Sequence, residues 1–143
     1  MNVLFGVLAM VVCLGLQALV ASFAIRFYGR RNTMVSNGSL GSGLLVITGV
    51  MVLLLVGNFM QIGIWAALFQ TLGEFDYFKD AFYHSAVNFA TLGYGDIVMS
   101  EAHRMLGPLE AINGVLMIGV STAVLMSAFQ DVAGKRRTPR SPS

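Results

Sequence analysis

The chain has 143 residues, enough for one domain, and 56% of them are hydrophobic while only 11% are charged. A soluble domain of this size needs a far larger polar surface, so the expected solvent is a lipid bilayer. The net charge is only +2, the single cysteine excludes an intrachain disulfide, and no Cys/His cluster offers a zinc site.

Three apolar segments are long enough to cross a membrane as helices. They run from about residue 3 to 25, 44 to 69 and 105 to 129, and each exceeds the roughly 20 residues needed to span a hydrocarbon core. We expect the first, assigned to an N-terminal helix at 1–28, to be retained rather than cleaved as a signal peptide, because no basic residue precedes it. The sequence therefore predicts an all-α membrane protein.

Basic residues predict how the chain is oriented. Arg30 and Arg31 lie in a polar loop at 29–43, and further basic residues lie in a tail at 130–143. Positively charged loops stay in the cytoplasm, so both segments should be inside and the N-terminus outside. We expect a multi-pass protein of the cell (plasma) membrane with a cytoplasmic C-terminus. The tail either binds anionic membrane lipids or only enforces this topology.

The segment between the second and third spans contains a short apolar stretch and a glycine motif. Residues 78–90 are predicted to form a re-entrant helix, because an apolar run of about ten residues is too short to span the membrane. Residues 91–96 follow, with glycine at alternate positions, Gly93 and Gly95. Left-handed conformations at alternate residues point successive backbone carbonyls in one direction, and glycine reaches them without a Cβ penalty. Carbonyls arranged in this way can replace the hydration water of a cation.

The motif Ala-Thr-Leu-Gly-Tyr-Gly-Asp at 90–96 resembles the selectivity-filter signature of potassium channels. Its place between an outer helix at 44–69 and an inner helix at 105–129 is similar to that in small bacterial two-helix-pore channels, here with an additional N-terminal helix. The resemblance covers residues 44–129. It implies a potassium-selective channel and a homotetramer, because one loop cannot surround an ion.

The resemblance also implies roles for single residues. The backbone carbonyls that would bind dehydrated K⁺ are those of Thr91, Leu92, Gly93 and Tyr94. Gly95 completes the filter, and four copies of Asp96 would concentrate cations at the outer mouth. Leu92 stands where valine is commoner in the family, which leaves the degree of selectivity open.

Several residues are candidates for supporting the filter. We expect Tyr83 or His84 to hold Asp96; the alternative is that both only anchor in the membrane interface, which aromatic residues favour. Glu110 would brace the filter or the re-entrant helix, with Asn113 or His84 as a partner, because a carboxylate at that depth is costly unless it is paired or wet. The alternative for Glu110 is a side chain that snorkels to the outer interface.

Two further questions have competing answers: the use of two glycines, and the function itself. Gly114 and Gly119 in the third span form either a gating hinge, as related channels have, or sites of close helix packing. The competing functions are a weakly selective monovalent cation channel, which Leu92 favours, and a non-conducting accessory subunit. An enzyme is not expected, because no nucleophile–base pair is present. Neither a cofactor besides the permeant K⁺ nor a nucleic-acid partner is expected.

Overall fold

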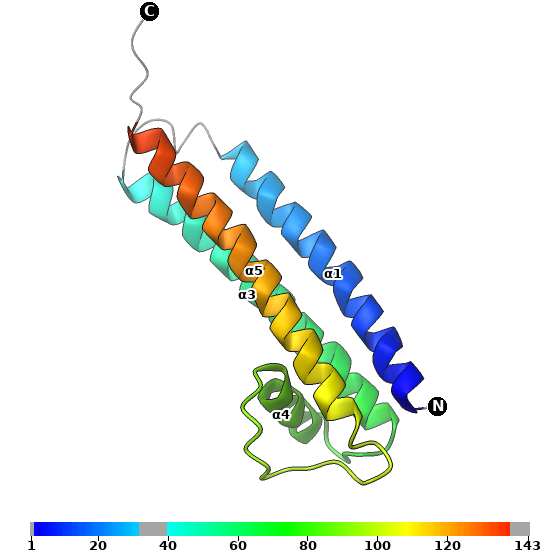
Figure 1. The fold of residues 1–143 in the computed structure, drawn as a ribbon. Helices are drawn as coiled ribbons and strands as arrows, with labels where there is room; N and C mark the ends of the chain where they lie inside the picture. The colour runs from blue at the N-terminus through cyan, green and yellow to red at the C-terminus, as the bar shows by residue number, and fades with distance from the viewer. Residues whose placement is uncertain (1, 32–39, 138–143) are drawn as a thin grey trace, which may run out of the picture.

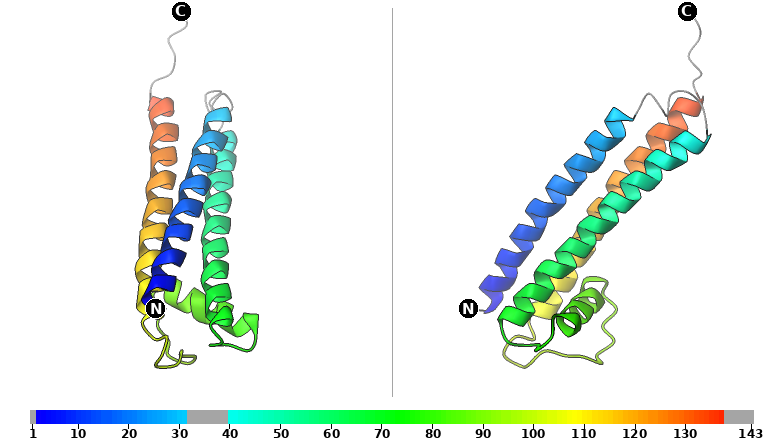
Figure 2. Two further views of the ribbon diagram at one scale, coloured as in Figure 1. Left: turned by 90° about the vertical axis from the view of Figure 1, so that its right-hand side faces the viewer. Right: turned by 180° about the vertical axis from the view of Figure 1, so that it is seen from behind.

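The structure, a computed structural model, describes residues 2–31 and 40–137. Within these residues the regular secondary structure is entirely helical: α1 (Asn2–Arg30), α3 (Leu40–Thr71), α4 (Phe78–Phe89) and α5 (Leu106–Arg137). The three long helices run side by side and each contacts the other two, whereas the short α4 lies at one end of the bundle (Figures 1 and 2). The N-terminus lies at the same end as α4, and α5 finishes at the opposite end (Figure 1).

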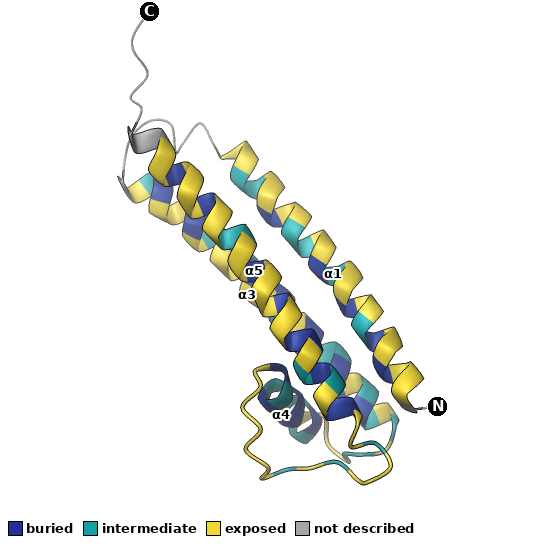
Figure 3. Cartoon of the chain, viewed as in Figure 1, coloured by how far each residue is buried: buried dark blue, intermediate teal, exposed yellow. Residues whose placement is uncertain are grey.

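Each long helix can cross a membrane. The apolar spans are Val3–Arg30, Gly41–Thr71 and Leu106–Gly134. With a rise of about 1.5 Å per residue, each is longer than a hydrocarbon core of about 30 Å. Exposed residues lie along the outer faces of the helices (Figure 3). Many of them have large apolar side chains, as expected for a chain whose solvent is lipid. The predicted all-α membrane fold, with three long apolar helices and a short helix between the second and third of them, is confirmed.

All three long helices extend beyond their predicted ends, and α1, predicted to end at residue 28, ends at Arg30. α5 continues to Arg137, although the sequence assigns 130–143 to a tail, and α3 begins at Leu40, inside the predicted loop. The prediction followed hydropathy, which drops at these points. A helix needs only continuous backbone hydrogen bonds, and the first proline after the start of the tail is Pro139. The rest of the loop, 32–39, and of the tail, 138–143, lies outside the described residues.

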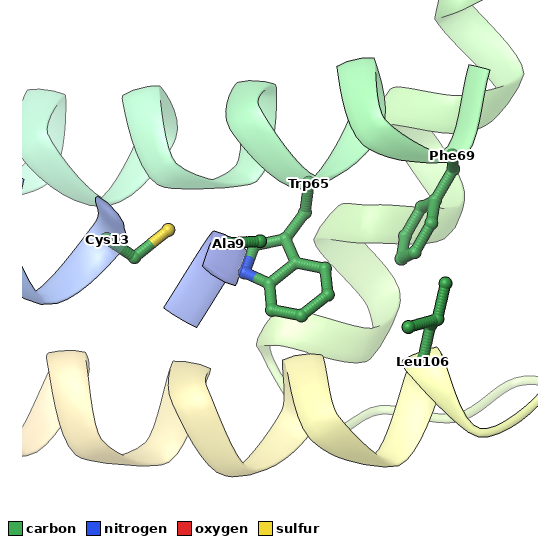
Figure 4. Packing of buried hydrophobic residues seen from close by; sticks show 5 residues of the cluster. All are labelled: Ala9, Cys13, Trp65, Phe69 and Leu106. Carbon is green, nitrogen blue, oxygen red and sulfur yellow. The ribbon is translucent and has the colours of Figure 1, made fainter. Parts of the chain in front are cut away.

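α1 packs closely against α3 and α5 at the end that carries α4. Ala9 and Cys13 of α1, Trp65 and Phe69 of α3, and Leu106 of α5 form one buried cluster (Figure 4). Because lipid is as apolar as these side chains, the cluster is stabilised by close van der Waals contact rather than by the removal of water. The N-terminal helix is therefore part of one packed bundle with the other two.

A buried polar network crosses the middle of this bundle. The side-chain amide of Gln17 donates hydrogen bonds to Ser121 Oγ at 2.9 Å and to the backbone carbonyl of Met117 at 3.3 Å. Gln61 in turn donates to Gln17 Oε1 at 2.7 Å. Since lipid offers no hydrogen-bond partners, these polar groups are satisfied only when the three helices stay together.

Replacing Gln17 by leucine is expected to weaken the attachment of α1. The substitution removes the two hydrogen bonds that Gln17 donates and the acceptor that Gln61 uses, each worth roughly 0.6 kcal/mol on average between membrane helices. The free energy of unfolding in mixed micelles should fall by about 2 kcal/mol, whereas Leu19→Ala, at an exposed position of the same helix, should change it little. Equal stability of the two variants would contradict this role of the network.

Candidate functional site

α4 ends in a turn that leads directly into the glycine motif. The backbone N–H of Leu92 donates to the carbonyl of Val87, and that of Thr91 donates to the carbonyl of Asn88, both at 2.8 Å. Thr91 itself has a positive φ of 58°. Two such bonds around a left-handed residue form a Schellman motif, a common end of a helix before a sharp change of direction. Thr91 is therefore the left-handed residue that terminates the helix, and it is also the first residue of the segment 91–96.

Left-handed backbone recurs at every second residue of residues 91–96, which we call the filter loop. Thr91, Gly93 and Gly95 have φ values of 58°, 58° and 72°, while Leu92 and Tyr94 between them have no positive φ. In a regular strand successive carbonyls alternate in direction. Alternating backbone handedness turns them toward one side, which is the arrangement that cation coordination by main chain requires.

The left-handed conformation of Thr91 is not one that the sequence predicts. Threonine has a Cβ that crowds the next carbonyl oxygen in this conformation, at a cost of roughly 1–2 kcal/mol. The hydrogen bonds of the Schellman motif offset this cost. The usual residue at such a helix end is glycine or asparagine, so no local sequence signal indicates that Thr91 is left-handed.

Tyr83 holds the C-terminal end of the filter loop. Its Oη donates to Asp96 Oδ2 at 2.7 Å. This hydrogen bond lowers the pKa of Asp96 and raises the pKa of Tyr83, so Asp96 is an anion at neutral pH. Of the two residues expected to hold Asp96, it is Tyr83 that makes the contact in this structure.

His84 holds the next residue of the chain instead. Its Nδ1 lies 2.8 Å from the carbonyl oxygen of Ile97, and its Nε2 lies 2.8 Å from the side-chain nitrogen of Asn88. A carbonyl can only accept, so Nδ1 carries the proton and Nε2 accepts from Asn88, which assigns the neutral tautomer. Burial lowers the pKa of His84, in agreement with a neutral ring.

The chain that follows the filter loop is tied to the segment just after α3. Glu74 accepts hydrogen bonds from the backbone N–H of Ser100 at 2.7 Å and from its hydroxyl at 2.6 Å, and it contacts His103 Nδ1 at 2.5 Å. Burial alone would raise the pKa of Glu74, but the hydrogen bonds from Ser100 and His103 outweigh it, so the pKa is lowered. These residues come from distant segments, so no spacing in the sequence points to the contact.

Acid is expected to release this contact. A carboxyl group with a lowered pKa contributes stability that is complete above its unfolded pKa, about 4.3 for glutamate, and that is lost as the pH falls through the folded value. The melting temperature of the native protein should therefore drop more steeply below about pH 4 than that of Glu74→Gln. Glu101→Gln, at an exposed position, should keep the native profile. Identical acid profiles of the native protein and Glu74→Gln would refute this assignment.

α5 approaches the end of α4 so closely that only glycine fits at position 114. A Cβ added to Gly114 would lie 2.0 Å from the backbone carbonyl oxygen of Phe89. An added Cβ at Gly119 would meet nothing within 4 Å. Close packing therefore describes Gly114 in this structure, whereas a hinge at Gly119 stays a prediction.

Glu110 contacts α4 through a partner other than those expected. Its Oε1 is hydrogen-bonded to the hydroxyl group of Ser85, and neither His84 nor Asn113 is bonded to it. Consecutive residues of a helix point about 100° apart, so Ser85 faces α5 while His84 faces the chain beyond the filter loop. Asn113 is fully buried on the same helix as Glu110. A lone serine in a short apolar helix gave no signal that would single out Ser85.

The oxygens that the residues of this loop could offer to an ion in consecutive positions belong to the main chain. Among the residues that the structure describes, no group of three His, Cys, Asp or Glu side chains could hold a metal ion. The filter loop instead presents the carbonyl groups of consecutive residues with alternating backbone handedness. Rings of such carbonyls are suited to a dehydrated monovalent cation.

A short re-entrant helix followed by such a loop, set between two spans, defines the membrane proteins that carry a pore loop. Residues 51–131, more than half of the chain, match the family described as ion channel, and the chain belongs to this family. The resemblance to two-helix-pore ion channels is thereby confirmed. The match covers most of α3, all of α4 and most of α5, whereas α1 lies outside it. No curated protein and no solved structure matched the chain.

Proposed function

We propose that four copies of the chain surround a central axis and conduct K⁺ selectively through the filter loop. The observation that carries this proposal is the left-handed backbone at Thr91, Gly93 and Gly95. This alternation supports the proposal, because it would direct the carbonyl groups of residues 91–94 to one side, where they could replace the hydration shell of a K⁺ ion. Irregular backbone is tolerated at membrane depth only where it is buried in protein or lines a watery path.

The exposed surface of the filter loop supports assembly with further copies. The side chains of Leu92 and Tyr94 are 54% and 65% exposed in the single chain, although both are large and mainly apolar. Neighbouring copies around a fourfold axis would cover them. The Tyr94 ring would then pack against α4 of an adjacent copy and hold the carbonyls at the spacing that K⁺ needs.

Charge supports both the outer mouth and the orientation. Asp96 is an anion, and four copies of it would raise the local concentration of cations. The N-terminus lies at the filter end of the bundle (Figure 1), while Arg30 ends α1 at the other end. By the positive-inside rule, the filter end faces outside the cell membrane and the C-terminus faces the cytoplasm, where its basic residues meet anionic lipids.

Reversal potentials of the purified protein in liposomes test the proposal. With K⁺ on one side and Na⁺ on the other, a potassium-selective pore gives a large shift of the reversal potential, and barium should block the current. A current with almost no shift would replace the proposal by a weakly selective cation channel, and Leu92→Val should then restore selectivity. Absence of current under all ionic conditions would identify a non-conducting accessory subunit.

A further inference from the structure

The hydroxyl group of Ser85 lies between two oxygen atoms that belong to two other helices. Its Oγ is 2.9 Å from the backbone carbonyl oxygen of Ile62 on α3, and it is also hydrogen-bonded to Oε1 of Glu110 on α5. Both Ser85 and Glu110 have no exposed surface. One small side chain of α4 therefore connects the helices on either side of it, beneath the end of the helix that leads into the filter loop.

The number of protons at this contact is limited. A serine hydroxyl carries one hydrogen, and a backbone carbonyl oxygen can only accept. If Glu110 were ionised, both neighbours of the Ser85 hydroxyl would be acceptors. The single hydroxyl hydrogen could then serve either Ile62 or Glu110, and the other contact would have no hydrogen between its two oxygen atoms. If Glu110 is protonated, its own O–H supplies the second proton. Glu110 then donates to Ser85 Oγ, and Ser85 donates to the carbonyl of Ile62.

Among the described residues, the side chains that interact with Glu110 are those of Ser85 and Asn88, and both are neutral, so neither balances a negative charge. The salt bridges among the described side chains, His103–Glu74 and Arg104–Glu101, do not include it. Glu110 lies within the span Leu106–Gly134. An ionised carboxylate at membrane depth is costly unless it is paired with a cation or hydrated, whereas a hydrogen-bonded carboxylic acid avoids this cost.

We propose that Glu110 is a neutral carboxylic acid and that it positions α4 through a chain of two donated hydrogen bonds, from Glu110 to Ser85 and from Ser85 to Ile62. The chain fixes α4 relative to α5 and α3 within one subunit. Its importance for conduction rests on the proposed function, because α4 carries the filter loop. The protonation state itself does not depend on which ion passes.

Infrared spectroscopy of the reconstituted protein at neutral pH tests the protonation state. The difference spectrum between the native protein and Glu110→Gln should contain the C=O stretching band of a carboxylic acid. In Ser85→Ala the band should persist but shift, because the acid loses the oxygen to which it donates. Absence of the band from the native spectrum, or a band that is unmoved in Ser85→Ala, would overturn the proposal.

Thermal melting of the assembled protein tests the positioning role. Glutamine can donate from its amide to Ser85 as the acid does, so Glu110→Gln should melt close to the native protein. Glu110→Leu has a similar volume but no donor, and it should melt at a clearly lower temperature. A Glu110→Leu protein as stable as Glu110→Gln would refute the role. If the native protein shows the infrared band but does not select K⁺ over Na⁺, only the proposed function is refuted.

Discussion

Replacement of Gly114 by alanine is expected to abolish potassium flux and to lower the melting temperature of the assembled protein. The new Cβ would lie 2.0 Å from the carbonyl oxygen of Phe89, so one of two backbones has to move. Overpacking of this kind costs about 1–3 kcal/mol or more in a well-packed interior. Phe89 is the last residue of α4, so its displacement also shifts Thr91 and the carbonyls of the filter loop. Liposome flux and thermal melting measure the two effects separately.

Gly119→Ala is the matched control on the same helix. Its Cβ meets nothing within 4 Å, and alanine is favoured over glycine in a helix by about 1 kcal/mol. This variant should be at least as stable as the native protein. If Gly119 is the hinge, only its open probability should change. A Gly114→Ala protein that melts and conducts like Gly119→Ala would show that α5 does not approach α4 as described.

Gly93→Ala is expected to remove the discrimination between K⁺ and Na⁺. Gly93 has a φ of 58°, and no atom of the same chain lies within 4 Å of an added Cβ, so within one chain the effect is conformational rather than steric. Staying left-handed costs an L-residue with a Cβ roughly 1–2 kcal/mol, and in the proposed tetramer this strain would be repeated in each copy. Relief of this strain turns a carbonyl away from the pore. The large bi-ionic shift of the reversal potential should therefore be lost.

Gly73 provides the control for this second prediction. It also has a positive φ, of 77°, and nothing within 4 Å of an added Cβ, but it lies in the turn after α3. Gly73→Ala introduces the same kind of backbone strain outside the filter loop, so selectivity should remain while stability decreases. If both alanine variants kept native selectivity, the carbonyls of the filter loop would not be the ion ligands.

Much of the fold could be predicted from the sequence, because the bilayer imposes simple lengths on apolar segments. Segments longer than a hydrocarbon core gave the three spans, and a short apolar run between two of them gave α4. The end of α5 could not be placed in this way, since its last turns lie beyond the apolar core and hydropathy carries no information about a helix there. The position of Pro139 indicates the end of α5 better than hydropathy does, because backbone hydrogen bonding can continue until a proline interrupts it.

For the candidate site, the sequence predicted the backbone conformation of the glycines better than it predicted the hydrogen-bond partners of the side chains. The glycines of the filter loop indicate left-handed backbone by their chemistry, whereas Thr91 reaches it through the hydrogen bonds at the end of α4. Tyr83 and His84 are neighbours in sequence, but they point in different directions and hold different residues. Ser85 pairs with Glu110 only because of how α4 crosses α5, which no local pattern reports.

The burial of Gln17 makes α1 part of the same packed bundle as the two helices that flank the filter loop. A version trimmed to the two helices that flank the filter loop would leave the side-chain amide of Gln61 without the acceptor that α1 supplies, whereas Ser121 would keep Asn58 of α3 as a partner. A two-helix version can therefore be cut from this protein only if Gln61 is first changed to an apolar residue. Transplanting the filter into a two-helix scaffold faces the same requirement, and a chimaera that keeps its own α1 avoids it.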